Sequence, residues 1–77
     1  MDIREAAIRK MAEVLGHVPE SITEDAVLTT LVSSSFVLVE MVIELQEEFG
    51  VRFQQVDMNG VTTVGQLLKL IESRVAD

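Results

Sequence analysis

The chain has no cysteine, tryptophan or tyrosine, and it has one histidine and three phenylalanines among 77 residues. The lack of cysteine excludes a disulfide framework, a thiolate metal site and a cysteine nucleophile. The lack of tryptophan and tyrosine leaves little for stacking on nucleobases or for enclosing a cationic ligand. Any thiol chemistry in which this protein takes part must therefore come from a group that is attached to it.

Basic residues are scarce as well. Six Lys and Arg stand against 13 Asp and Glu, which gives a formal net charge of −7. Proteins that bind the phosphate backbone of nucleic acids carry a surplus of cations, so we expect no nucleic-acid partner. An acidic surface instead predicts protein partners with basic surfaces.

Long apolar runs are absent, although 48% of the residues are hydrophobic. The longest run, Phe36 to Val39, is too short to span a bilayer, and no basic flank followed by an apolar stretch marks the N-terminus. We therefore predict a soluble, cytoplasmic protein without a membrane segment. Its length predicts a single domain, residues 1–77, whose core is too small to enclose a deep active site. Because the chain begins at Met1 and ends soon after its last predicted helix, we expect it to be free-standing.

Three segments have the apolar spacing of amphipathic helices. The first runs from Asp2 to Leu15 and is followed by Gly16, a residue suited to closing a helix. The second begins near a run of serines and ends at Gly50, and the third follows Thr63, whose spacing to Gln66 is that of a capping box. The core that these helices share is expected to include Leu15, Leu31, Leu45, Phe49, Phe53, Val64 and Leu68.

The segments between the helices are less periodic. Residues 22–32 show no clean period and predict an ordered loop, whereas Val56 to Met58 predicts a short helical turn. Together the elements predict an all-α fold. We expect a small four-helix bundle with three main helices, one short helix and a long first loop.

The second helix carries two apolar stripes when its residues are placed at about 100° intervals. The stripe that contains Met41 and Leu45 is the natural core face. The other stripe consists of Phe36, Val39 and Ile43, and it is bordered by Ser35, Glu40, Glu44 and Glu47. An apolar strip edged with carboxylates predicts a docking surface for a partner with apolar and basic groups. The alternative is that the helix is buried on both sides.

Three serines, residues 33–35, precede this helix. Ser33 or Ser34 is expected to cap the helix by accepting a hydrogen bond from one of its first amides. A serine in the first helical turn is exposed, and it lies where backbone amides and the helix dipole favour a phosphate. A phosphodiester on such a hydroxyl would be well placed.

No catalytic set of residues is evident. His17 lies in a loop with Pro19 and has neither a cysteine nor an evident acid partner, so a nucleophile triad or a metal site has little support. We expect this histidine to be solvated. We expect no enzyme activity and no metal.

The stretch LVSSSFVLVEMVIELQEEFGVRF resembles the second-helix region of acyl carrier proteins and peptidyl carrier domains. In that family a serine within a DSL-type motif carries 4'-phosphopantetheine. The resemblance continues through VTTVGQLLKLI, which is similar to the family's last helix, and back to Leu15-Gly16. It implies that Ser35 is the serine that bears 4'-phosphopantetheine as a covalent cofactor, here within SSF in place of DSL.

The resemblance also implies a non-catalytic, monomeric carrier that holds acyl or aminoacyl groups as thioesters. Its expected partners are a phosphopantetheinyl transferase and acyl-loading, condensing and modifying enzymes with basic docking surfaces. The polyketide and nonribosomal peptide pathways are favoured over fatty-acid synthesis, because fatty-acid carriers usually keep the aspartate and a more acidic surface. The positions at which the family docks its enzymes correspond to Phe36, Val39, Glu40, Ile43, Glu47 and Glu48.

The chain departs from the family pattern in two places. Ser34 stands where the family has an aspartate that assists the transferase, and Val32 stands where it often has a glycine. Two alternatives therefore accompany the carrier interpretation. One is a carrier-like interaction protein that is never pantetheinylated, and the other is an unrelated helical adaptor.

Overall fold

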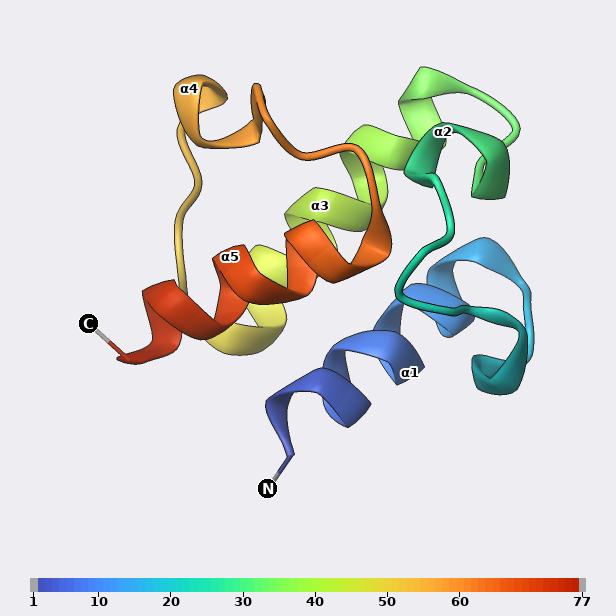
Figure 1. Cartoon of the computed structure of the whole chain (residues 1–77), viewed down its shortest axis with the longest axis horizontal. Helices are drawn as coiled ribbons and strands as arrows, with labels where there is room; N and C mark the ends of the chain where they lie inside the picture. Colours follow the sequence, from blue (N-terminus) through green and yellow to red (C-terminus); the bar gives the residue numbers. More distant parts are fainter. Residues whose placement is uncertain (1, 77) are drawn as a thin grey trace.

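Helices make up the regular structure of the computed structural model, which describes residues 2–76 (Figure 1). In chain order the elements are α1 (Ile3–Leu15), the 3-10 helix η1 (Pro19–Ser21), α2 (Leu28–Leu31), α3 (Ser35–Phe49), α4 (Gln55–Met58) and α5 (Val64–Ala76). The long helix α1 packs against both α3 and α5, and α2 lies beside the start of α3. The predicted all-α bundle is confirmed.

The long first loop contains one helical turn that periodicity did not predict. Helix α2 has only four residues, which are too few to show a helical period, and two of them are threonines with modest helix propensity. Tertiary contacts hold it instead. Leu28 is buried, and its N–H donates to the carbonyl of Thr62 at 2.9 Å.

The ends of the long helices follow the predicted capping residues. Asp2 Oδ1 accepts hydrogen bonds from the amides of Arg4 and Glu5 at the start of α1. Gly16 and Gly50 end α1 and α3 with φ of 73° and 64°, in the left-handed region that a side chain disfavours. These two glycines therefore set where α1 and α3 stop.

The core lies where α1, α3 and α5 meet, and the predicted core residues all contribute to it. Leu45, Val64 and Leu68 are completely buried, together with Met11, Met41, Leu67 and Ile71. The other four predicted residues are partly buried and pack against this cluster: Leu15, Leu31, Phe49 and Phe53. Among the residues described, no helix is long and apolar enough to cross a membrane.

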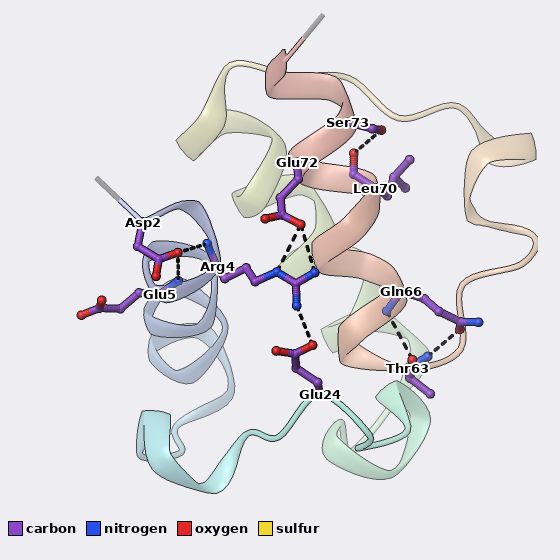
Figure 2. A network of polar contacts seen from close by, with 9 residues as sticks. All are labelled: Asp2, Arg4, Glu5, Glu24, Thr63, Gln66, Leu70, Glu72 and Ser73. Atoms are coloured by element: carbon purple, nitrogen blue, oxygen red, sulfur yellow. Dashed lines mark hydrogen bonds and ion pairs between the residues drawn. The ribbon is translucent and has the colours of Figure 1, made fainter.

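Polar contacts fasten the first loop to α1 and α5 (Figure 2). Arg4 on α1 donates hydrogen bonds to Glu24 of the loop and to Glu72 of α5, and these bonds raise the pKa of Arg4. At the start of α5 the amides of Val64 and Gly65 donate to loop carbonyls at 3.0 and 2.8 Å. The loop is thus ordered, as predicted, and it fixes the approach of the chain to α3.

Candidate functional site

The site begins at the junction between the first loop and α3. Ser34 is the N-cap of α3, and its Oγ accepts a hydrogen bond from the amide of Val37 at 3.4 Å. Ser35 is the first residue of the helix and is exposed. Its hydroxyl makes no hydrogen bond to any other residue in the range 2–76. The two neighbouring serines therefore differ. The Ser34 side chain accepts a hydrogen bond from an amide in the first turn of α3, whereas the Ser35 hydroxyl is free.

The backbone before α3 presents these hydroxyls to solvent. Val32 and Ser34 both have extended backbone, and Ser33, Ser34 and Ser35 are all exposed. A shallow depression beside the junction is lined by side chains of α1, α2 and α3, among them Val14, Leu31 and Val37. Ser35 itself is exposed to solvent.

The second apolar stripe of α3 is exposed. Phe36, Val39 and Ile43 keep 85%, 56% and 49% of their surface accessible, whereas Met41 and Leu45 on the opposite side are completely buried. A helix buried on both sides is therefore excluded for these three positions. The strip is an unpartnered apolar face next to Ser35, as periodicity predicted.

The carboxylates of α3 fall into two groups. Glu40 and Glu47 are exposed beside the apolar strip, and neither forms an ion pair within residues 2–76. Glu48 lies about 140° around the helix from Ile43, on the side that faces α1. Glu44 and Glu48 lie 3.5 and 3.8 Å from Lys10 Nζ of α1.

Lys10 links α1 to α3 through these carboxylates. Its ammonium group is also 3.8 Å from Glu13, and the three carboxylates raise the pKa of Lys10, with Glu13 as the largest cause. Sequence reasoning missed this link because it joins positions on different helices. The signal available beforehand was only that α3 has acidic residues and no basic residue of its own.

An open groove extends the apolar strip towards the C-terminal end of α3. Gln46 Oε1 accepts a hydrogen bond from the amide of Phe53 at 2.9 Å, and the carbonyl of Gln46 accepts one from Val51 at 3.0 Å. These bonds fix the segment after α3 beside the helix. The groove between them is lined by Ile43, Gln46, Glu47, Gly50, Val51, Arg52 and Phe53. The role of Gln46 was not predicted, although a polar residue between two apolar stripes indicates a side-chain hydrogen bond.

The described residues contain no cluster of three or more His, Asp or Glu side chains that could hold a metal ion. His17 is exposed, and its Nε2 lies 3.4 Å from the carbonyl oxygen of Leu31. The site offers two exposed serines whose hydroxyls form no hydrogen bond within residues 2–76, Ser33 before the helix and Ser35 at its first position. Beside them lie the apolar strip and the unpaired carboxylates of Glu40 and Glu47.

Comparison with known proteins agrees with this geometry. The family described as "Phosphopantetheine attachment site" matches residues 5–71. An acyl carrier protein of Saccharopolyspora erythraea is 40% identical over 76 residues, which cover 97% of this chain and 80% of the relative. An acyl carrier protein of Thermotoga maritima is 32% identical over 66 residues, which cover 84% of this chain and 82% of the relative.

The matches span α1 to α5, and they include both the serine-bearing junction and the exposed strip. An unrelated helical adaptor is therefore excluded. The chain belongs to the acyl carrier protein family, whose members are carriers rather than catalysts and hold a covalently attached 4'-phosphopantetheine.

Proposed function

We propose that this protein is an acyl carrier protein in which Ser35 bears the 4'-phosphopantetheine group. The observation that carries the proposal is that two adjacent serines differ in their hydrogen bonding. Ser34 Oγ is used to cap α3, while the Ser35 hydroxyl is exposed at the first position of the helix. Ser35 is thus the serine in this run that combines a helical position with a free oxygen.

The residues around Ser35 fit a phosphodiester. The first turn of α3 contains no acidic residue that would repel a phosphate. The amides at the start of a helix and the helix dipole favour a negative charge there. The modification joins Ser35 Oγ to the phosphorus of the pantetheine phosphate, expels the adenosine bisphosphate half of coenzyme A and releases the hydroxyl proton.

The attached group supplies a terminal thiol that holds acyl or aminoacyl groups as thioesters, which accounts for a carrier that has no cysteine. The chain itself contributes recognition. Its docking surface for acyl-loading, condensing and modifying enzymes consists of Phe36, Val39, Glu40, Ile43 and Glu47, with Glu48 further round the helix on the side towards α1. Of these, Glu48 contributes least charge to a partner because Lys10 lies close to it.

We place the protein in polyketide or nonribosomal peptide biosynthesis, as a cytoplasmic monomer. Ser34 replaces the aspartate that fatty-acid carriers usually keep, and Gln54 and Gln55 follow α3 where acidic residues are common in the family. A net charge of −7 opposes self-association. The Ser34 replacement also favours a second candidate, a carrier-like interaction protein that is not pantetheinylated.

Intact mass after incubation with coenzyme A and a broad-specificity phosphopantetheinyl transferase distinguishes the two candidates. We expect the wild-type chain to gain the mass of one phosphopantetheine group and Ser35→Ala to gain none. Ser33→Ala and Ser34→Ala are the matched controls, and both should still be loaded. Loading of Ser35→Ala would assign the group to another serine, and no loading with any transferase would favour the unmodified interaction protein.

A further inference from the structure

The groove beside α3 carries opposite charges on its two walls. Glu47 lies on the helix, and Arg52 lies on the segment that Gln46 holds in place. Both side chains are exposed, and neither forms an ion pair with a residue in the described range. Lys10 pairs with Glu44 and Glu48 on the other side of α3. The groove therefore offers a partner two unpaired charges of opposite sign, Glu47 from the helix and Arg52 from the segment after it.

This arrangement limits the surfaces that can dock. A uniformly basic enzyme face would be attracted to Glu40 and Glu47 but repelled by Arg52. Like charges that meet across an interface disfavour a partner, and opposite charges favour it. The groove therefore fits a face that combines basic groups, one carboxylate and an apolar side chain able to cover Ile43, which is 49% exposed.

The partner whose position is tied to Ser35 is the phosphopantetheinyl transferase. Its active site must reach the Ser35 oxygen itself, whereas later enzymes act at the far end of the attached group. Ile43 follows Ser35 by eight residues, which corresponds to about 12 Å along a helix. An enzyme positioned over Ser35 that covers Phe36 and Val39 also reaches the groove.

We propose that Arg52 is a specificity-determining residue for pantetheinylation. The transferase that modifies this chain pairs a carboxylate with Arg52 and basic groups with Glu40 and Glu47. Arg52 thereby favours transferases that carry a matching carboxylate over transferases that bind through the acidic residues alone. This inference rests on the proposed function, because it assumes that Ser35 is modified.

The test compares Arg52→Glu with Lys69→Glu, since each lowers the net charge by two. Lys69 is exposed on α5, outside the groove, and likewise forms no ion pair within residues 2–76. Loading from coenzyme A is measured with the enzyme that modifies the wild-type chain fastest in a panel of purified transferases. At low salt we expect kcat/KM of Arg52→Glu to be about fivefold or more below that of Lys69→Glu. Arg52→Gln should be intermediate, and the differences should shrink at about 0.5 M salt.

Thermal midpoints of the three variants check that folding is unchanged, and Arg52→Gln carries the test if Arg52→Glu does not fold. Equal rates for Arg52→Glu and Lys69→Glu, or faster loading of Arg52→Glu, would overturn the role of Arg52 and leave modification of Ser35 standing. If no transferase in the panel loads the wild-type chain, the proposed function fails and this inference fails with it.

Discussion

Ser34 and Ser35 are neighbours in the sequence but have different structural roles, because α3 begins between them. The N-cap needs a side-chain acceptor and extended backbone, and Ser34 provides both. Ser35, the next residue, is already helical and exposed, and its hydroxyl forms no hydrogen bond within residues 2–76. Ser34 and Ser35 are the same amino acid, so their different roles follow from their positions relative to the start of α3.

Replacing Ser34 with aspartate tests what the missing carboxylate would add. Asp is as good an N-cap as Ser, and its charge at the start of α3 adds about 0.3–1 kcal/mol of favourable dipole interaction. We therefore expect Ser34→Asp to fold at least as stably as the wild type and to be loaded faster by a transferase. Thermal unfolding and initial loading rates measure the two effects.

Ser34→Asn is the matched control, because it keeps the cap and lacks the charge. Faster loading of the aspartate variant than of the asparagine variant would show that the transferase uses the carboxylate. Equal rates would mean that the native motif already suits its transferase.

At the scale of the element, α3 has two apolar faces, of which one is buried and the other is exposed. Both arise from the same helical period, so the sequence predicted that they exist. The sequence also indicated the stripe with Met41 and Leu45 as the core face, and the structure confirms this, since Leu45 is completely buried and Ile43 is 49% exposed. One helix thus contributes both to the core and to the exposed apolar strip that we propose as the docking surface.

Truncating one residue on each face of α3 should separate stability from docking. Leu45→Ala removes a completely buried side chain and should lower the free energy of unfolding by about 2–5 kcal/mol. Ile43→Ala removes an exposed one and should change it by about 1 kcal/mol or less. Denaturant unfolding of both variants measures the difference. Similar losses would contradict the orientation of α3.

The ion pair between α4 and α5 predicts a dependence of stability on pH. The amide of Gln54 donates to Asp57 at 2.9 Å and Arg74 lies 2.6 Å from the same carboxylate, and together they hold the pKa of Asp57 below its ordinary value of 3.8. The charged form is thus favoured in the folded state. Its stabilisation is complete above the unfolded pKa and is lost as the pH falls through the lower, folded pKa.

We accordingly expect Asp57→Asn to be less stable than the wild type near pH 7 and the difference to shrink on acidification below about pH 4. Thermal unfolding across this range measures it. Asp25→Asn is the control, since Asp25 forms no ion pair in the part of the chain that the structure covers. A constant difference between Asp57→Asn and the wild type at all pH values would argue against this pair.

For the whole molecule, the sequence predicts those features that depend on the spacing of residues within one helix. The long helices, their caps and the apolar strip follow from local spacing and were predicted. The one-turn α2 is too short to show a period, and Lys10 pairs with Glu44 through the packing of two helices. The free-standing state and the monomer remain predictions.

The bonds between the first loop and α5 also determine how this domain opens. The amides of Leu28, Val64 and Gly65 all donate across the contact between these two segments. Because the three bonds join the same two short stretches of chain, we expect the loop and the first turn of α5 to open as one cooperative unit. The free energy needed to open the loop is then the same as that needed to open the start of α5. If enzymes dock at Ser35 as we propose, they meet an ordered surface and lose little affinity to the entropy of ordering it.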